Sequence, residues 1–409
     1  MANYPSLNSV KSVLAFGMNL ITTNKALLET CLALKNQPFI AVDTEFMRET
    51  TYWPKLCLIQ VAAEGVEAII DPLVEGLDLS PLLEIMRDVE ILKLFHAPRQ
   101  DLEIFFKLMK NNLPTPVFDS QTAAMALGLG EQVAYDGLVQ ALLGHSVDKT
   151  HRFTDWSIRP LSQNQLVYAL ADVTHLRDLY PIMVERLEKL GRLQWVIEEM
   201  EGLTNPLTYD TTPTNAWKRM KPKRFSAEYL AAFYTAATWR EWFAQERDIP
   251  RGRALKDDAI FEIAEQKPRT AEALERMRAI PRGFANSKGG IALLEALNEA
   301  LDHPEEFAPK AQKPKHNPPG LGAIVELLKV LLRAVADELA VAPKLIATAS
   351  DLEAIAANDD ADCQIMHGWR REVFGNKALR LKHGEIALSI QKRQVVTTEI
   401  AENEVIQQP

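Results

Sequence analysis

Phe39-Ile-Ala-Val-Asp-Thr-Glu-Phe46 is a short, apolar, partly β-branched segment that carries two acidic residues near its end. Its length and composition predict a buried strand. Side chains alternate between the two faces of a strand, so Asp43 and Glu45 emerge on one face, about 7 Å apart along the backbone. Two carboxylates this close are costly unless positive charge lies between them. A solvated strand end explains the same pattern, so the pair alone does not define a site.

The segments around this strand predict an α/β domain with a mixed sheet. Three further apolar runs predict strands: 56–63, 66–71 and 91–96. Glu64-Gly65 between the first two favours an antiparallel hairpin. Three stretches predict helices: one that begins with a capping Ser80 and Pro81, one over 101–110, and one from Ser162 to about Lys189 with Gln165 at capping-box spacing. Strands in hairpin order, followed by strands alternating with helices, imply a sheet with helices on both faces.

The chain of 409 residues is too long for one hydrophobic core, so several domains are expected. After residue 206 the pattern becomes helical and no strand is predicted. The proline-rich segment 302–320 predicts a non-helical spacer between two helical blocks. We therefore expect five segments: an N-terminal extension (1–20), the α/β domain (21–204), two small helical domains (214–301 and 320–392) and a polar tail (393–409) predicted to be disordered.

Composition and cysteine usage narrow the class of protein. Hydrophobic residues make up 47% and charged residues 25%, as in a soluble globular protein. Cys31, Cys57 and Cys363 form no C-x-x-C pair, which argues against a zinc ribbon or a disulfide framework and predicts a cytoplasmic location. The N-terminus lacks a signal-peptide pattern, and the longest apolar stretch, 321–335, is interrupted by charges, so no membrane association is expected.

Charge is unevenly distributed along the chain. The net charge of −9 disfavours a polyanionic partner unless positive charge is concentrated somewhere. Segment 214–256 carries ten basic and four acidic residues, with aromatic residues between them. Such a pattern suits a nucleic-acid surface, with cations on phosphates and rings on bases. For the rings, a helical core is the favoured interpretation, because Trp239 and Trp242 lie at helical spacing.

Two more places carry acids that could join Asp43 and Glu45. Asp101 follows His96-Ala97-Pro98 at a predicted helix start, where an Asp is usually an N-cap. Tyr168 and Asp172 are four residues apart on the long helix and so share a face. Taken alone, the pair is best explained as a tyrosine in the core beside an aspartate at the surface. We interpret His96 as a strand-end histidine whose hydrogen bonds are satisfied.

Residues 22–190 resemble the DEDD exonuclease superfamily, and ribonuclease D in particular, at three places in order. The first motif and its following strand are matched by VDTEF and RETTYWPKLCLIQ, the second motif by LFHAPRQDLEIF, and the third, of the form Y-x-x-x-D, by RPLSQNQLVYALADVTHL. HRFTDW, which ends at Trp156, resembles the stretch upstream of the third motif. The sister branch has a histidine where this chain has Val167, so the tyrosine branch is the better match.

This resemblance implies a ribonuclease-H-like exonuclease domain that hydrolyses RNA from its 3′ end and releases nucleoside 5′-monophosphates. It implies that Asp43, Glu45, Asp101 and Asp172 are ligands of two divalent cations, with Asp43 touching both. Four carboxylates supply the oxygen ligands that Mg²⁺ or Mn²⁺ prefer, and paired ions suit phosphodiester hydrolysis. Tyr168 would orient the attacking water or help to deprotonate it.

The helical blocks carry a second resemblance. TNAW and AQERDIPRGRALKDDAIFEIAEQKP resemble the helicase-and-ribonuclease-D C-terminal (HRDC) domain, and GLGAIVELLKVLLRAVADELA begins a block that resembles a more divergent copy. Such domains are auxiliary nucleic-acid binders. The resemblance implies RNA with a single-stranded 3′ end, such as a tRNA precursor, as the partner of a monomeric enzyme.

Two other functions stay open on the sequence. The same motifs serve DNA exonucleases of the proofreading type, although helical domains after the nuclease, without a polymerase, favour RNA. A non-catalytic nucleic-acid-binding scaffold with a decayed site is the third possibility. The presence of all four acids and of the tyrosine weighs against it.

Overall fold

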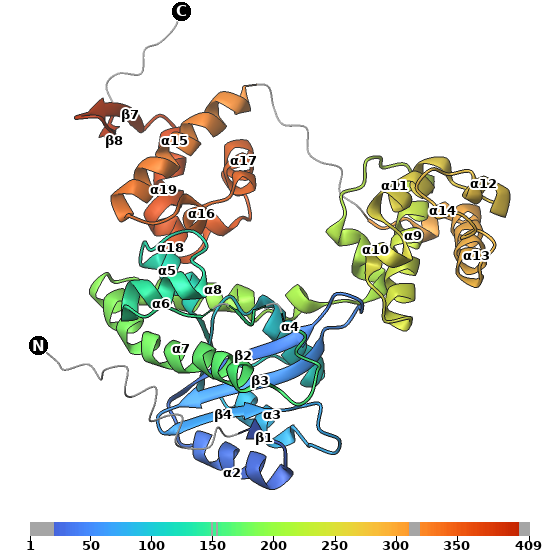
Figure 1. The fold of residues 1–409 in the computed structure, drawn as a ribbon. Coiled ribbons are helices and arrows are strands. Elements are labelled where there is room, and N and C mark those ends of the chain that lie inside the picture. Colours follow the sequence, from blue (N-terminus) through green and yellow to red (C-terminus); the bar gives the residue numbers. More distant parts are fainter. Residues whose placement is uncertain (1–19, 149, 153, 311–319, 401–409) are drawn as a thin grey trace, which may run out of the picture. The chain divides into compact units, whose positions relative to one another are not determined.

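The computed structural model describes residues 20–148, 150–152, 154–310 and 320–400. Among these residues, one compact unit comprises those up to Glu45, Leu58–Asn205 and those from 320 onward, and a second comprises Phe46–Cys57 and 206–310. Within the described ranges, no helix is both long and apolar enough to cross a membrane. Figure 1 shows the helices and strands of both units.

A six-stranded sheet forms the centre of the first unit, in the order β1-β4-β3-β2-β5-β6. Its strands are β1 (Leu20–Ile21), β2 (Phe39–Met47), β3 (Lys55–Ala63), β4 (Val66–Ile70), β5 (Leu92–Phe95) and β6 (Val117–Asp119). β3 and β4 are antiparallel around Glu64-Gly65, whereas β1 with β4, β2 with β5 and β5 with β6 are parallel. The predicted hairpin and the mixed sheet are therefore confirmed.

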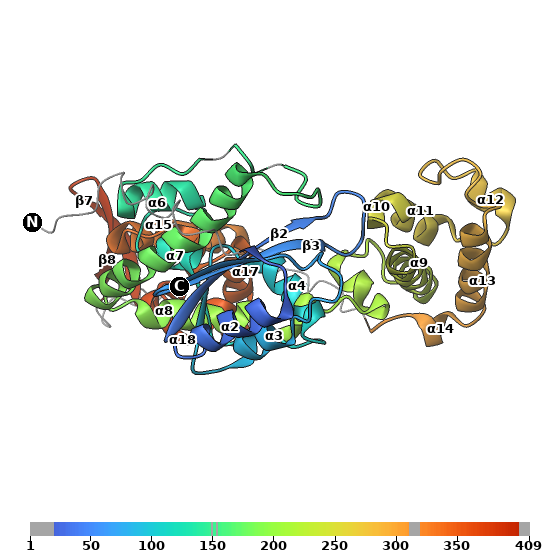
Figure 2. The same cartoon turned by 60° about the horizontal axis from the view of Figure 1, so that its bottom comes forward.

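Helices cover both faces of this sheet, as predicted (Figure 2). They are α2 (Asn24–Leu34), α3 (Ser80–Arg87), α4 (Arg99–Leu108), α5 (Ser120–Ala126), α6 (Tyr135–Leu143), α7 (Gln163–Lys189) and α8 (Leu193–Leu203). The long helix α7 packs on β4 and β5, and α2 packs on β4 and on α3. Side chains alternate between the two faces of β4. Glu67 faces α7 and pairs with Arg177, and the residues on either side of Glu67 point to the opposite face.

Local hydrogen bonds set the helix starts. The predicted capping box of α7 is confirmed, because the Ser162 hydroxyl accepts the backbone N–H of Gln165 and the Gln165 side chain accepts that of Ser162. The predicted capping role of Ser80 is wrong. Its backbone N–H and hydroxyl both donate to the carboxylate of Asp78, at 2.9 and 2.6 Å. A charged acceptor two residues earlier binds the serine in a local turn, so Ser80 is already helical and does not cap.

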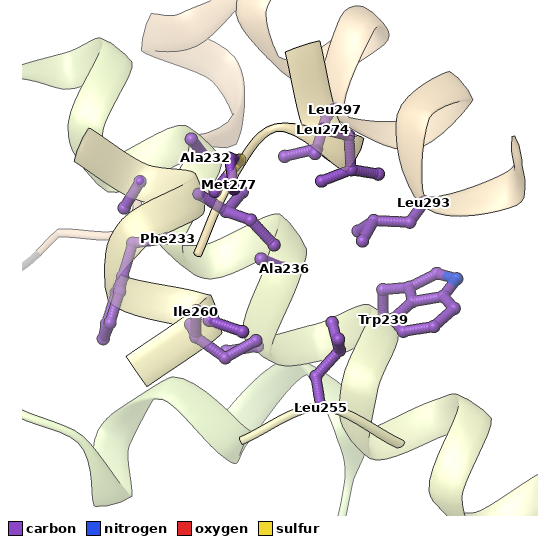
Figure 3. Packing of buried hydrophobic residues seen from close by; sticks show 14 of the residues in the cluster. Ala232, Phe233, Ala236, Trp239, Leu255, Ile260, Leu274, Met277, Leu293 and Leu297 are labelled. Carbon is purple, nitrogen blue, oxygen red and sulfur yellow. The ribbon is translucent and has the colours of Figure 1, made fainter. Parts of the chain in front are cut away.

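Among the described residues, five helices and two 3-10 turns accompany α9 (Ala227–Glu246) in the helical part of the second unit. Their bounds are η1 (Pro206–Tyr209), η2 (Pro213–Arg219), α10 (Arg251–Ala254), α11 (Asp257–Gln266), α12 (Ala271–Glu275), α13 (Lys288–Asp302) and the single turn α14 (Pro304–Phe307). Figure 3 shows Phe233 and Trp239 of α9 packed among Leu, Ile and Met side chains of this core. The segment 302–320 was predicted to be a non-helical spacer. This prediction is wrong for the first part of the segment, where α14 forms. Pro304 lies at the start of α14, where its missing N–H costs nothing.

The segment Phe46–Cys57, here named the β2–β3 loop, comprises the end of β2, the connection and the start of β3, and it belongs to the second unit. Tyr52 is only 3% exposed, and its hydroxyl hydrogen-bonds to the carboxylate of Glu241, whose side chain is fully buried. Arg251 donates to both groups, at 2.6–2.7 Å. Burial alone would raise the pKa of Glu241, but these hydrogen bonds outweigh it and hold the pKa below its ordinary value. The backbone N–H groups of Tyr52 and Trp53 both donate to Asp248 at 3.0 Å.

Tyr52→Phe is expected to lower the free energy of unfolding of the second unit by about 2 kcal/mol, because hydrogen bonds to charged groups contribute about 1.5–3 kcal/mol. Urea unfolding followed by tryptophan fluorescence would measure the loss. The same substitution in a Glu241→Gln background should cost less, since the acceptor is then neutral. Equal costs in the two backgrounds would show that the hydroxyl does not stabilise the buried carboxylate.

A C-terminal helical block completes the first unit. It contains α15 (Leu321–Leu339), α16 (Pro343–Ile346), α17 (Ala349–Ala357), η3 (Gln364–Met366), α18 (Gly368–Arg370), η4 (Arg371–Gly375) and α19 (Asn376–Lys382). The ring of Trp369 stacks on Trp195 of α8 with centroids 4.3 Å apart, and Arg370 pairs with Glu199 of the same helix. The contacts that hold this block on α8 thus include the aromatic stack, the ion pair and hydrogen bonds from Trp369 to Glu198 and Glu199.

The prediction that no strand follows residue 206 is wrong. β7 (Ile386–Gln391) and β8 (Gln394–Glu399) form an antiparallel hairpin. Its turn is Lys392-Arg393, both with positive φ, where hairpin turns usually carry Asn or Gly. The tail predicted to be disordered thus begins with a strand, and its residues 401–409 lie outside the described part of the chain.

Candidate active site

The two acids of β2 lie at the centre of the candidate site. Asp43 and Glu45 emerge on one face of the strand, and Thr44 between them is buried. Asp172 reaches them from α7. One carboxylate oxygen from each of the three acids lies within 4.8 Å of the other two. Such a group of oxygen atoms is suited to a divalent cation.

Asp101 lies beside this group but is not one of the acids whose carboxylate oxygens lie within 4.8 Å of one another. It is in the first turn of α4 and is 8% exposed, and its carboxylate accepts a hydrogen bond from the Thr44 hydroxyl. The alternative that Asp101 caps α4 is wrong, because the capping position is Pro98 and no side chain caps the helix. The buried carboxylate thus contacts Thr44 of β2.

Burial raises the pKa of all four carboxyl groups, and repulsion from neighbouring carboxylates adds to this effect for Asp43 and Glu45. Burial raises the pKa of Asp43 well above its ordinary range, and the charges of Asp101, Asp172 and Glu45 raise it further. Burial, with the charges of Asp172 and Asp101, raises the pKa of Glu45 to about 9. Burial also raises the pKa of Asp172 to about 7 and that of Asp101 to about 6. A divalent cation between them would offset this cost of ionisation.

Tyr168 lies one helical turn before Asp172, as the Y-x-x-x-D spacing predicts. A hydrogen bond from Tyr168 lowers the pKa of Asp172, against the larger effect of burial. Burial raises the pKa of the Tyr168 phenol, and the charges of Asp172 and Glu45 add to this. The Tyr168 ring packs against Trp156 and His151, with centroids 6.0 and 6.4 Å away. His151 and Trp156 therefore form the wall behind the tyrosine.

A cavity of about 370 Å³ opens beside the carboxylates. Asp43, Tyr168 and Asp172 line one side of it. The other lining residues were not proposed as site residues from the sequence: His96, Ala97, Gln121, Gln132, Ala134, Tyr135, Asp136, Val147, Asp148, Arg152 and Leu176. Most come from segments between the three motifs, where no local pattern marked them.

His96 has hydrogen-bond partners, as predicted. Its Nδ1 lies 2.9 Å from the Ser120 hydroxyl, and the backbone carbonyl of Val133 is a second partner. Burial lowers the pKa of the imidazole, which favours the neutral ring.

Several of the basic residues in 214–256 serve the second unit itself. Arg219 and Arg251 bind the buried Glu241, and Arg240 is buried and pairs with Asp257. The positive charge counted in segment 214–256 is therefore larger than the charge available to bind a nucleic acid.

The core interpretation of the aromatic residues holds for most of those that interleave with these cations. Tyr229 and Trp239 are buried in the core, and Trp217 and Phe225 pack against it. Trp242 is the exception, with 49% of its surface exposed.

The metal-free protein is expected to be less stable at pH 8 than at pH 5.5. Raised carboxyl pKa values mean that the folded state holds more protons than the unfolded state above about pH 4, so the free energy of unfolding falls as pH rises toward the pKa values of 6, 7 and 9 given above. Urea midpoints in EDTA at the two pH values would measure this. Asp172→Asn should make the pH dependence shallower, and an equal slope in both proteins would contradict the role of the cluster.

The chain is similar to known nucleases over almost its whole length. A family model described as 3′-5′ exonuclease matches residues 18–188, and a model of the HRDC domain matches residues 230–297. The ribonuclease D of Nitrobacter hamburgensis is 50% identical over 382 residues, which are 93% of this chain and 100% of the relative. The chain belongs to the ribonuclease D family. The ribonuclease D of Gluconacetobacter diazotrophicus is 46% identical over 92% of this chain and 95% of its own length.

The fold agrees with that of a solved ribonuclease D. The crystal structure of the Escherichia coli enzyme superposes with a TM-score of 0.81 at 28% identity, over 90% of this chain and 99% of that one. Membership of the ribonuclease D family makes the chain a 3′→5′ exoribonuclease, as the three motifs predicted. The predicted fold, an α/β exonuclease domain with helical domains after it, is also confirmed.

Proposed function

We propose that this chain shortens RNA from the 3′ end by hydrolysis assisted by two divalent cations, Mg²⁺ or Mn²⁺. The observation that carries the proposal is the set of carboxylate oxygens of Asp43, Glu45 and Asp172 within 4.8 Å of one another. Carboxylates are the ligands that these hard cations prefer, and a bound cation would offset the cost of ionising four buried acids. The donor set therefore fits the cations that two-ion nucleases use.

Each acid has a proposed role in that set. Asp43 lies among the other three, whose charges all raise its pKa, so it would touch both cations. Glu45 and Asp172 would complete one site, and Asp101 would contribute to the other. When bound, the cations would activate the attacking water and neutralise charge on the leaving oxygen.

Tyr168 is proposed to hold the attacking water. Its hydroxyl is next to Asp172 and lines the cavity in which the terminal nucleotide would lie. Water attacks the last phosphodiester phosphorus, and the bond to the 3′ oxygen of the preceding nucleotide breaks. That oxygen gains a proton, so the products are a nucleoside 5′-monophosphate and a shortened RNA with a free 3′ hydroxyl.

The helical domains are proposed to bind the remainder of the RNA. We propose the division into exonuclease domain (21–204), HRDC domain (214–301) and divergent HRDC-like domain (320–392), with the HRDC match at 230–297 in support of the second. The Escherichia coli relative is described as an exoribonuclease involved in structured RNA processing. By analogy, tRNA precursors with a single-stranded 3′ end are the proposed substrates of this chain. We propose that the enzyme is a monomer and that it works in the cytoplasm, because its three cysteines lie far apart in the sequence with no C-x-x-C pair.

The test compares 5′-labelled single-stranded RNA and DNA of one sequence, each with Mg²⁺, Mn²⁺ or EDTA. The proposal expects a ladder of RNA products shortened from the 3′ end, release of nucleoside 5′-monophosphates, and no reaction in EDTA. Faster degradation of DNA would favour the proofreading type of exonuclease. Binding without cleavage of either strand would favour a non-catalytic scaffold.

A further inference from the structure

Tyr135, the first residue of α6, makes a contact with α7 that the reaction as described above does not use. Its hydroxyl donates a hydrogen bond to the backbone carbonyl of Asp172 and lies 3.4 Å from the carbonyl of Ala171. The side chain lines the same cavity as Asp43, Tyr168 and Asp172. The phenol thus holds the backbone of α7 at the residue that supplies a proposed metal ligand.

This contact is unusual for the middle of a helix. The carbonyl of Asp172 lies inside α7, where helical geometry already supplies the N–H four residues on as a donor. The second donor comes from another helix, so it fixes the position of α7 and not its internal structure.

The Tyr135 ring is itself held in place from the other side. It packs edge-on against His96, with centroids 5.3 Å apart. His96 is fixed by the Ser120 hydroxyl, and the N–H of the next residue, Ala97, donates to Asp119 at 2.8 Å. A continuous row of contacts therefore runs from the ends of β5 and β6, through His96 and Tyr135, to the backbone of Asp172.

We propose that Tyr135 is a positioning residue that sets the place of the Asp172 carboxylate relative to Asp43 and Glu45. The proposal rests on the metal site of the proposed function. Mg²⁺ demands near-ideal octahedral geometry with short bonds, whereas Ca²⁺ accepts longer bonds and variable geometry. A small shift of α7 should therefore weaken Mg²⁺ binding more than Ca²⁺ binding.

The experiment is calorimetric titration of the full chain, without RNA, with MgCl₂ and separately with CaCl₂. Tyr135→Phe removes only the hydroxyl. Loss of groups that orient metal ligands typically weakens metal binding by about 10- to 100-fold, and we expect about 10-fold for Mg²⁺ and less than about 3-fold for Ca²⁺. The thermal midpoint of the metal-free variant should stay within about 3 °C of wild type, which excludes general loosening of the fold.

Two further variants separate this role from a merely structural one. Tyr180→Phe removes a hydroxyl from another α7 tyrosine, whose ring packs on Phe39 and Phe118 away from the cavity, and should leave both affinities unchanged. In an Asp172→Asn background, Tyr135→Phe should change the Mg²⁺ affinity by less than about 2-fold, because the ligand through which it acts is already neutral.

An unchanged Mg²⁺ affinity in Tyr135→Phe, or equal weakening of Mg²⁺ and Ca²⁺, would overturn the positioning role and leave the proposed function intact. A full further loss in the Asp172→Asn background would overturn it as well, since Tyr135 would then act elsewhere. Failure of the wild-type chain to bind Mg²⁺ at all would overturn the proposed metal site and this inference with it.

Discussion

Asp172→Asn is expected to reduce kcat at saturating Mg²⁺ by about 10³-fold or more, because metal ions contribute several kcal/mol to stabilisation of the transition state in such sites. The substitution removes one of the three carboxylates whose oxygens lie within 4.8 Å of one another. Asp43→Asn, Glu45→Gln and Asp101→Asn should have effects of the same kind. Single-turnover rates on a short labelled RNA, with Mg²⁺ titrated separately, would measure them.

The fold should survive this substitution. Without metal, neutralising Asp172 relieves repulsion within the cluster, so the thermal midpoint of the metal-free protein should hold or rise. Asp178→Asn on the same helix is the matched control, because Asp178 pairs with Arg177 at the surface and is not part of the cluster. It should leave kcat unchanged. A near wild-type rate for any of the four cluster variants would remove that residue from the proposed ligand set.

Tyr168→Phe is expected to lower kcat by about 10²–10⁴-fold, the usual contribution of a group that holds or deprotonates the attacking water. The ring remains, so its packing on Trp156 and His151 and the position of α7 should be kept. Affinity for Mg²⁺ and for RNA should then stay close to wild type. This pattern is the opposite of the one expected for Tyr135→Phe, in which the affinity for Mg²⁺ falls.

Tyr180→Phe again serves as the control, since it removes a hydroxyl from α7 outside the cavity. Quenched-flow measurement of the chemical step on a short RNA, at saturating metal, would separate chemistry from product release. A chemical step within a few-fold of wild type would show that Tyr168 is only a packing residue.

Much of the exonuclease fold could be predicted because its signals are local. The strand at 39–46, the Glu64-Gly65 hairpin and the capping box at Ser162 each depend on residues within a few positions of one another. The candidate acids could be named because three motifs occur in order along the chain. That Asp43, Glu45 and Asp172 come together is a property of the fold, since β2 and α7 are far apart in sequence.

Other features depend on tertiary contacts that carry no local signal. Tyr135 donates to a backbone carbonyl 37 residues away. Every residue has a backbone carbonyl, so the pattern of side chains could not predict this contact. Arg219 and Arg251 appear in the sequence as part of a basic stretch, but both bind the buried Glu241. The β7–β8 hairpin was missed because Lys392-Arg393 lacks the Asn or Gly that usually marks such a turn.

The burial of Tyr52 has a practical consequence for anyone who wants a smaller nuclease. A fragment cut after Asn205 would keep the β2–β3 loop but lose Glu241, Arg251 and Asp248, the groups that bind it. The rings of Tyr52 and Trp53 would then be exposed to solvent and form an apolar patch that promotes self-association. Replacing both rings with polar residues should restore solubility to the shortened enzyme. The smallest independent nuclease is therefore obtained by redesigning this loop, because a cut after Asn205 leaves the loop without the residues that bind it.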